Sequence, residues 1–504
     1  MSGKYSLLTA LFLGTLFHAH AQQYQESALR FSEINVNGTA RFQGLGGGHA
    51  ALGGDPSTLT ANPAGLGFYT RSEVTFTPGF QSVNSDSRYL SSAITEDKGG
   101  MIIGNASLVI ANEVGGYRES KWRGTAMGIS FNRQQNFKRS YSFGGAGTVD
   151  YAFIDQIVDN LNDAIQRGDF TRSQLDQGYD VDSRTGEVYL DYLEGLYYNI
   201  YAIDPESDDP KARFYPVETS SPVRPSGYVD HTGSHTQWTF AYAGNYDNKL
   251  YLGGSLGFNR IVNSVNKVIH EDFPNAEVLR SMRYEEWTDM DGTGVNFTLG
   301  AIYKVTPEVQ LGLNISTPTF MKIRHSLYER ASVEVVQPDD LPTAGRTHPW
   351  DFDYSQIGPF RASFGGTWFL PGQFGFITAS ADFVGYKGMK LSHDRERDGA
   401  WNDLTGWYRN VVNPKVGAEL RLENFRVRAG VAYFMDPYEG KLMDLTEDKI
   451  NVSGGLGYRG NRFFVDASLL YGKQQIAYQI FNGSDVGRVT FKDLSGVLTL
   501  GFNF

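Results

Sequence analysis

The sequence predicts an all-β protein: a closed transmembrane antiparallel β-barrel of about 14 strands, with an N-terminal plug (hatch) in the lumen. Three observations support this fold class. From residue 72 onward, segments of roughly ten residues alternate between apolar and polar side chains, as the strands of a membrane barrel do. The connections between these segments alternate between short and long. The chain is also rich in glycine and aromatic residues, with Gly 58, Tyr 29 and Phe 33.

Residues 1–21 are typical of a cleaved secretory signal peptide. Lys4 precedes a short apolar run over 7–17, and Ala19-His20-Ala21 places small residues at a cleavage site. The apolar run is shorter than the roughly 20 residues that a membrane-spanning helix needs. We therefore expect export, and a mature chain that begins near Gln22.

Residues 22–70 lack the alternation of a strand and are instead rich in turn residues. The glycine run includes Gly46-x-Gly48-x-x-Ala51, which resembles a dinucleotide fingerprint, but no strand precedes it and no βαβ unit follows. Glycines and Asn-Pro pairs mark tight turns. We expect a compact plug inside the lumen, ahead of the first barrel strand.

Residues 71–504 are expected to form the barrel. The alternation is clear over 309–316, where apolar and polar residues take opposite faces: Val309, Leu311, Leu313 and Ile315 against Gln310, Gly312, Asn314 and Ser316. The predicted strands cover 72–81, 99–110, 122–134, 236–246, 249–263, 293–305, 307–320, 360–370, 374–391, 411–421, 424–436, 449–459, 461–480 and 489–504.

The connections predict the orientation of the barrel. Short turns such as Asp247-Asn248 alternate with long connections over 135–235, 264–292, 321–359, 392–410 and 437–448. Bacterial barrels have short periplasmic turns and long extracellular loops. We therefore expect both termini in the periplasm and a large extracellular loop at 135–235.

The final strand indicates how the chain reaches the membrane. Leu498, Leu500, Phe502 and Phe504 share one face, which is the pattern expected of a signal for the barrel-insertion machinery. Aromatic residues near strand ends, such as Trp238 and Trp368, are typical of interfacial girdles. We expect a multi-pass barrel in the cell outer membrane, in contact with its lipid and lipopolysaccharide.

The segment from Ser57 to Leu66, STLTANPAGL, resembles the hatch of the FadL family of outer-membrane transporters for long-chain fatty acids and other hydrophobic compounds. Asn62, Pro63, Ala64 and Gly65 carry the motif. Residues 359–365, 382–386, 415–419, 428–430 and 436–438 are similar to the branch described as hydrophobic-compound or hemin transporters. The resemblance spans most of the chain after the signal peptide, except the 135–235 insertion.

This resemblance implies uptake of hydrophobic small molecules, such as long-chain fatty acids. The ligand would bind in an extracellular groove and a lumen pocket, and the hatch would gate its passage. In the family, the exit is often a lateral gap at a kinked strand. Gly124 and Gly128 in the third predicted strand are candidates for such a kink, because glycine in a strand often marks a bend.

Two groups of residues are candidates for ligand binding. Ile154, Ile157 and Leu161 have helical spacing, which favours an amphipathic helix as a groove wall, and Tyr197 and Tyr198 add an aromatic patch. A loop that packs on itself would show the same pattern. Arg361 and Arg428 lie on the polar face of their strands, where they would either hold a ligand carboxylate or pair with lumen acids such as Glu419.

The sequence gives little support to other chemistry. The absence of cysteine excludes thiol catalysis, iron–sulfur clusters and disulfides, and a net charge of -11 argues against nucleic-acid binding. His231 and His235 have a spacing that suits a metal on a helix, but Gly233 between them favours a loop. We expect no catalytic residues, no metal and no cofactor.

Three alternatives on the same fold remain open. The first is a scaffold or shuttle in surface protein export. The second is an outer-membrane lipid-hydrolysing enzyme, for which His325-Ser326 is the nearest candidate pair, although neighbours on a strand face opposite ways. The third is an open porin, which a plug-like N-terminus disfavours.

Overall fold

The structure, a computed structural model, describes residues 26–113, 120–145, 147–168, 171–175, 180–182, 184, 187–218, 222–337, 342–393, 406–440 and 445–504. The expected signal peptide over 1–21 lies outside the described residues.

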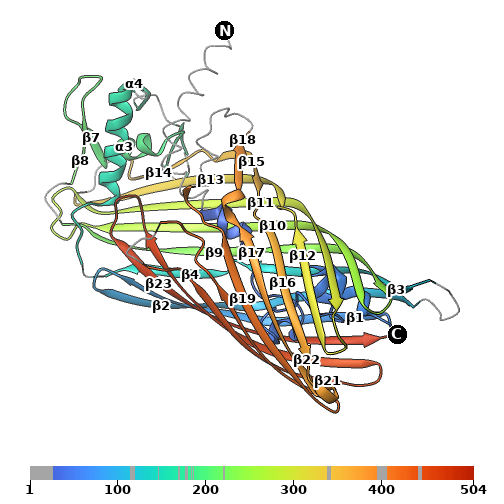
Figure 1. The fold of residues 1–504 in the computed structure, drawn as a ribbon. Helices are drawn as coiled ribbons and strands as arrows, with labels where there is room; N and C mark the ends of the chain where they lie inside the picture. The colour runs from blue at the N-terminus through green and yellow to red at the C-terminus, as the bar shows by residue number, and fades with distance from the viewer. Residues whose placement is uncertain are drawn as a thin grey trace, which may run out of the picture.

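Fourteen antiparallel strand positions form one closed sheet, which confirms the predicted barrel. Three positions consist of two strands in line, namely β12 with β13, β16 with β15, and β17 with β18. β23 pairs with β1 from Glu73↔Asn503 to Arg88↔Arg488, and this pairing closes the barrel (Figure 1). The barrel strands are β1 (Glu73–Tyr89), β2 (Ser92–Glu113), β3 (Trp122–Asn136), β9 (Arg224–Tyr246), β10 (Leu250–Asp272), β11 (Leu279–Lys304), β12 (Val309–Ser316), β13 (Phe320–Val335), β15 (Trp350–Ile357), β16 (Phe360–Phe369), β17 (Gly375–Gly385), β18 (Lys390–His393), β19 (Val411–Leu422), β20 (Phe425–Phe434), β21 (Lys449–Arg459), β22 (Phe463–Gln479) and β23 (Val486–Asn503).

The predicted alternation of apolar and polar faces is confirmed. On β12, Leu311 and Leu313 are 40% and 50% exposed, whereas their neighbours Gln310 and Asn314 are 4% and 8% exposed. The exposed apolar face points away from the lumen, where a bilayer would cover it. Among the residues that the structure describes, no helix combines the length and hydrophobicity needed to cross a membrane.

The short turns lie where the sequence predicted them. Asp247 and Asn248 have φ of 56° and 55°, the left-handed backbone of a two-residue hairpin turn. A short 3-10 turn, η3 (Pro371–Gln373), joins β16 to β17. The Phe504 backbone N–H donates to the Ser72 carbonyl at 3.0 Å, so the C-terminus lies at this short-turn rim.

The strands extend further at the opposite rim than predicted. The expected loops at 264–292 and 321–359 are wrong, because β10 and β11 continue to a turn at 273–278 and β13 and β15 occupy most of the second range. Likewise β9 begins at Arg224, inside the expected 135–235 loop. Outward side chains here are polar, as at Lys322 and Arg324, since water rather than lipid faces them. The alternation that reveals a lipid-facing strand is therefore missing.

The described residues between β4 and β9 form a cap at this rim, at the end opposite the C-terminus (Figure 1). A cluster of buried apolar side chains joins the cap to inward-facing residues of β10, β11 and β13. Glu271 on β10 accepts hydrogen bonds from the first backbone N–H groups of helix α3, at 2.6 Å from Phe153 and 3.4 Å from Ile154. The elements beyond the barrel strands are β4 (Arg139–Gly144), α3 (Phe153–Arg167), α4 (Arg172–Leu175), β5 (Asp180–Val181), β6 (Val188–Leu190), α5 (Leu193–Asn199), β7 (Ile203–Pro205), β8 (Phe214–Pro216), β14 (Ala344–Thr347) and η4 (Tyr386–Gly388).

Residues 26–70, called here the N-terminal segment, form short helices rather than strands. They are a helical stretch over 26–32, α2 (Ala40–Gly44), η1 (Pro56–Leu59) and η2 (Pro63–Phe68). Figure 1 shows these helices, in blue, among the barrel strands. α2 contacts β20 to β23, whereas η2 contacts β9, β10 and β11. The segment thus touches inward-facing surfaces on both sides of the barrel.

Candidate functional site

The motif Asn62-Pro63-Ala64-Gly65 fixes the end of the N-terminal segment to the barrel wall. The Asn62 side chain caps η2 by accepting from the Ala64 N–H at 3.1 Å, and Pro63 is at the start of the turn, where its missing N–H costs nothing. The Asn62 amide also donates to the Ala50 carbonyl at 2.6 Å and to the Leu313 carbonyl on β12 at 3.4 Å. One side chain therefore joins two turns of the segment to a barrel strand.

Inward-facing glycines allow the segment's backbone to lie directly on the wall. A Cβ at Gly430 on β20 would lie 2.2 Å from the Gly46 nitrogen, and one at Gly312 on β12 would lie 1.9 Å from the Ala50 oxygen. These contacts are with backbone atoms, which no rotamer change relieves. The glycines on the polar face of the strands thus allow the N-terminal segment to pack closely against the barrel wall.

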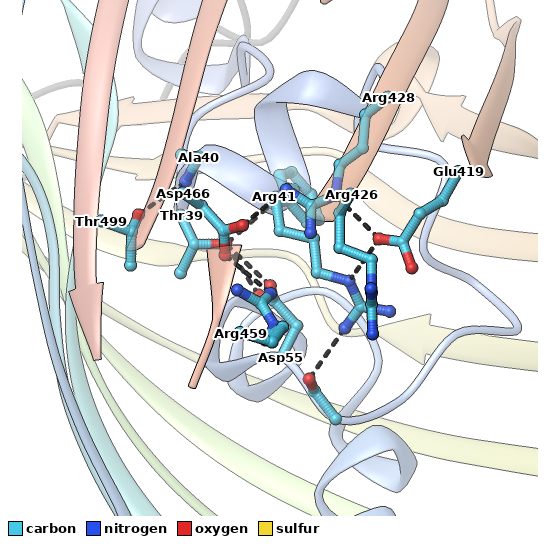
Figure 2. Close-up of polar contacts among 12 residues, drawn as sticks. Thr39, Ala40, Arg41, Asp55, Glu419, Arg426, Arg428, Arg459, Asp466 and Thr499 are labelled. Carbon is cyan, nitrogen blue, oxygen red and sulfur yellow. Dashed lines mark hydrogen bonds and ion pairs between the residues drawn. The ribbon is translucent and has the colours of Figure 1, made fainter. Parts of the chain in front are cut away.

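An ionic cluster lies beneath α2, formed by Arg41 and the barrel residues Glu419, Arg421, Arg428, Arg459 and Asp466 (Figure 2). Arg428 donates to Glu419 and to Asp466, both at 2.7 Å, and all three side chains are at most 3% exposed. Arg41 of the segment reaches Glu419 at 3.5 Å and donates to the Gly54 carbonyl at 2.8 Å. Charges are thus paired across the boundary between segment and barrel.

Asp55 organises the segment beside this cluster. Its carboxylate accepts from the Thr39 hydroxyl at 2.9 and 2.8 Å and from the Ser57 N–H at 2.8 Å. Thr39 in turn caps α2 by accepting from the Phe42 N–H, and the Ala40 N–H donates to Thr499 on β23 at 2.8 Å (Figure 2). These bonds hold the start of α2 against the last strand.

A luminal cavity of about 1370 Å³, including its open mouth, lies between part of the segment and the wall. The segment and the end of β20 contribute apolar side chains: Ile34, Phe42, Ala50, Ala61, Phe434 and Met435. Together with Phe383 and Val384, the wall contributes mainly amides and hydroxyls: Asn132, Gln134, Gln237, Asn296, Thr298, Asn314, Ser316 and Ser363. Polar residues of the segment such as Asn35 and Thr60 also line the cavity, so its lining is mixed rather than continuously apolar.

A second, upper cavity of about 1280 Å³ lies beneath the cap. Aromatic and aliphatic side chains of the cap and the long strands form its apolar lining, among them Tyr141, Phe153, Ile157, Tyr284, Tyr478 and Phe481. The helical stretch over 26–32 lies between the two cavities, since Glu26 and Arg30 line the upper one and Glu33 lines the luminal one. Burial lowers the pKa of Arg30 to about 10, with the neighbouring Arg139 acting in the same direction.

The barrel wall contains a seam, defined as the line between residues 96–104 of β2 and residues 133–142 of β3 and β4. Within the described residues, the β2–β3 ladder stops at Asn105↔Asn132, and β4 pairs with β9 but not with β2. Side chains bridge the line instead. Ser140 and Ser142 both donate to the Glu96 carboxylate, and Lys138 donates to the Gly99 carbonyl at 2.7 Å.

The N-terminal segment is attached to this seam. The Gln134 carbonyl on β3 accepts from the Asn35 N–H at 3.3 Å and from the Asn37 amide at 3.0 Å. The β3–β9 register shifts between Arg133 and Gln135, which places Gln134 in a bulge. Of the two candidate glycines for a kink, Gly124 adjoins a shift in the β3–β9 register between Trp122 and Gly124. At Gly128 the register is regular and Leu59 packs against the glycine, so the kink predicted there is wrong.

The candidate ligand-binding residues lie in different surroundings. Arg361 lines the luminal cavity and donates to the Ser32 carbonyl, and Ile157 lines the upper cavity. Arg428 lies in the ionic cluster. Ile154, Leu161 and Tyr197 are at most 2% exposed inside the packed cap, with Tyr198 beside them. Sequence reasoning missed the amides of the luminal cavity, whose only signal was their place on the polar face.

The two histidines on β9 lie in a strand rather than in the expected loop. His231 Nδ1 is 2.7 Å from the Arg30 guanidinium, and His235 Nε2 is 2.9 Å from the Asn259 amide oxygen. Both side chains face inward because a spacing of four residues keeps them on one face of a strand.

Comparison with known proteins shows the fold. No protein-family model matches the chain, and no curated protein matches it significantly. Among solved structures, a Pseudomonas aeruginosa FadL homologue matches 94% of this chain and 100% of its own, with TM-score 0.53 and 14% identity. The P. putida toluene transporter TodX matches 94% of this chain and 99% of its own, with TM-score 0.52 and 12% identity. At these identities the likeness concerns architecture, and the chain has the outer-membrane β-barrel fold of the FadL homologues.

Proposed function

We propose that this protein takes up hydrophobic small molecules, such as long-chain fatty acids, across the outer membrane. The observation that carries the proposal is the placement of the N-terminal segment between an aromatic upper cavity, a luminal cavity and a seam in the wall. The comparison structure named as a toluene transporter has the same fold, which supports this class of ligand. The proposal describes a transport protein and not an enzyme.

Entry would begin at the cap, which we place on the extracellular side. The upper cavity offers aromatic side chains and the aliphatic Ile157 to a ligand that leaves water. The ligand would then pass the helical stretch over 26–32 into the luminal cavity. The short-turn rim, with the C-terminus, faces the periplasm in this orientation, and the apolar outer face contacts lipid and lipopolysaccharide after the insertion machinery has assembled the barrel.

The N-terminal segment would act as the gate. It lies on the wall at glycine contacts and is held by the ionic cluster, and in this position it would block the lumen. The same segment bonds to Gln134 at the seam. A shift of residues 33–37 would therefore free the edge of β3 and open the luminal cavity at the same time.

Exit would be lateral, through the seam. Separating two laddered strands breaks a row of backbone hydrogen bonds, whereas this line is closed by side chains of Lys138, Ser140 and Glu96. A lateral exit also suits an apolar ligand, because the ligand moves into lipid without crossing water.

A disulfide between α2 and the wall tests the gate. The chain has no native cysteine, and a Cβ at Gly44 would lie 3.6 Å from the Ser468 Cβ on β22, within the range of a disulfide. In the Gly44→Cys/Ser468→Cys variant, oxidation should stop uptake of radiolabelled oleate or toluene by cells that depend on this barrel, and reduction should restore it.

Each single cysteine variant is the matched control, and should transport equally under oxidising and reducing conditions. Unchanged uptake by the fully oxidised double variant would show that the segment does not gate. Absence of uptake of oleate, toluene and the neutral polar compound 4-ethylphenol by the wild-type protein would refute the transport function itself.

A further inference from the structure

We infer that the luminal cavity selects an amphiphile whose head is neutral and forms hydrogen bonds, in preference to a plain hydrocarbon or a carboxylate. This inference rests on the proposed uptake function and narrows its ligand class. It depends on three observations: a connected row of amides on the wall, apolar side chains of the N-terminal segment that line the same cavity, and the pairing of charges around the cavity.

The amides form a belt across five neighbouring strand positions. Gln134 on β3 donates to Gln237 on β9 at 2.5 Å, and Gln237 donates to Asn296 on β11 at 3.2 Å. Asn296 accepts from Asn259 on β10 at 2.8 Å and donates to Ser316 on β12 at 3.3 Å. The belt begins at the seam, because Gln134 is also the residue that bonds to the N-terminal segment.

The belt resists a purely apolar ligand. Each amide has more donor and acceptor sites than its neighbours satisfy. A hydrocarbon pressed against these amides would take water from them and return no hydrogen bond, which is unfavourable. In the part of the chain that the structure describes, the Asn314 side chain makes no hydrogen bond with protein, and it lines the cavity. Asn314 is thus the wall residue best placed to bond to a ligand.

Charges around the cavity disfavour a carboxylate head. Lys415 is paired with Asp382 at 2.6 Å, and Lys449 is paired with Asp493 at 2.9 Å. Arg361, the third cationic side chain among the described residues that line the cavity, donates to a backbone carbonyl and shares the cavity with Glu33. An anionic head would therefore meet cationic side chains that are already bonded.

Apolar residues of the same cavity would accept the apolar part of the ligand. Ile34 and Phe42 of the N-terminal segment and Met435 after β20 line the cavity together with the belt residues. A ligand with a hydroxyl or carbonyl edge and an apolar body matches both kinds of lining residue. Displacing the segment would remove its apolar side chains and leave the ligand beside the seam.

Three compounds with one skeleton test the inference: ethylbenzene, 4-ethylphenol and 4-ethylbenzoate. Binding is measured by calorimetry at pH 7 with the full-length protein in lipid nanodiscs, after subtraction of partitioning into empty nanodiscs. We expect 4-ethylphenol to bind roughly tenfold more tightly than the other two, the factor that one or two neutral hydrogen bonds give. Asn314→Leu should lower the affinity for 4-ethylphenol by about 3- to 10-fold and should not lower that for ethylbenzene.

Leu313→Val is the matched control, because Leu313 is the next residue on β12 and is 50% exposed on the outer face. It should leave all three affinities unchanged. Equal binding of ethylbenzene and 4-ethylphenol, or tightest binding of 4-ethylbenzoate, would overturn the inference and leave the uptake proposal standing. Failure of all three compounds to bind the wild-type protein would count against both. The order of the compounds on the wild-type protein tests the inference even if the Asn314 variant does not fold.

Discussion

The Nε of Arg428 lies 2.7 Å from Glu419 Oε2, and the two side chains are 0% and 3% exposed. The pair joins neighbouring strands, β20 and β19, at Glu419↔Arg428. Arg41 of the N-terminal segment approaches the same carboxylate oxygen from the lumen at 3.5 Å. One carboxylate therefore connects the stability of the wall with the position of the segment.

Replacing Arg428 with Met should destabilise the folded barrel. The change leaves Glu419 with its more distant partners and Asp466 with Arg459 alone. Breaking a buried pair from one side costs about 3–5 kcal/mol in free energy of unfolding. Urea unfolding in detergent micelles, followed by tryptophan fluorescence, measures the loss. Arg260→Met is the control, because the Arg260–Asp291 pair is half exposed and should contribute under about 1 kcal/mol. An equal decrease in the free energy of unfolding in both variants would contradict the larger contribution expected of the buried pair.

Replacing Gly430 with Ala should displace the N-terminal segment while the barrel remains folded. The new methyl group would meet the Gly46 backbone, so residues 40–54 must move away. Hydrogen exchange should accelerate in residues 40–54 but not in β20, and overpacking should cost about 1–3 kcal/mol. Gly454→Ala on the next strand is the control, since a Cβ there meets only a carbonyl oxygen at 3.8 Å. Unchanged exchange in residues 40–54 would rule out the close contact.

His49 should make the protein less stable in acid. Burial lowers the pKa of this imidazole to about 3, and although Asp55 and Glu419 raise it, Arg41 and Lys415 oppose them. An unfolded histidine has a pKa near 6.5. Between these values the unfolded chain binds a proton that the folded protein does not, so stability falls as pH decreases from about 6.5 toward 3.

The His49→Phe variant isolates this contribution. Phe keeps the contact with Phe42, whose ring centroid is 4.5 Å from that of His49, and it does not titrate. We expect the difference in melting temperature between pH 7.5 and pH 4.5 to be smaller for the variant than for the wild-type protein, with circular dichroism as the measurement. The same difference in both proteins would show that His49 is not held neutral.

Glu96 should control the seam. Removing its carboxylate with Glu96→Ala deletes the bonds from Ser140 and Ser142. Because a hydrogen bond to a charged group contributes roughly 1.5–3 kcal/mol, exchange of the β4 amides should rise about tenfold or more. Under the lateral-exit proposal, uptake should rise as well. Asp97→Ala is the control, since Asp97 bonds to Asn84 and not across the seam. Slower uptake by Glu96→Ala would argue against exit at this line.

Much of the fold was predictable because a lipid-facing strand has a simple pattern of apolar and polar residues in the sequence. Leu311, Leu313 and Ile315 had to be apolar for the bilayer, and their neighbours had to suit the lumen, so the period of two was visible without a structure. The number of strands was predicted by counting the segments with this pattern. The outer halves of β10, β11 and β13 lack this alternation because water rather than lipid faces them. The loops expected there were therefore wrong.

The candidate site was less predictable. Arg361 and Arg428 share the same pattern in the sequence, yet one lines the luminal cavity and the other is held by Glu419 and Asp466. Which inward residue meets the segment and which meets the cavity depends on how residues 26–70 fold within the barrel. These contacts join positions that are hundreds of residues apart in the sequence, so no local sequence pattern predicts them.

The sequence alone determined the barrel, the outward apolar face and the existence of a turn-rich segment before the first strand, because each depends on local periodicity or turn chemistry. Only the tertiary structure decided the seam, the amide belt and the ionic cluster. Each of these arises where distant strands or the N-terminal segment meet, as Gln134 meets Asn37 and Arg41 meets Glu419. Closing a barrel brings such residues together, and chain order does not show which ones will be partners.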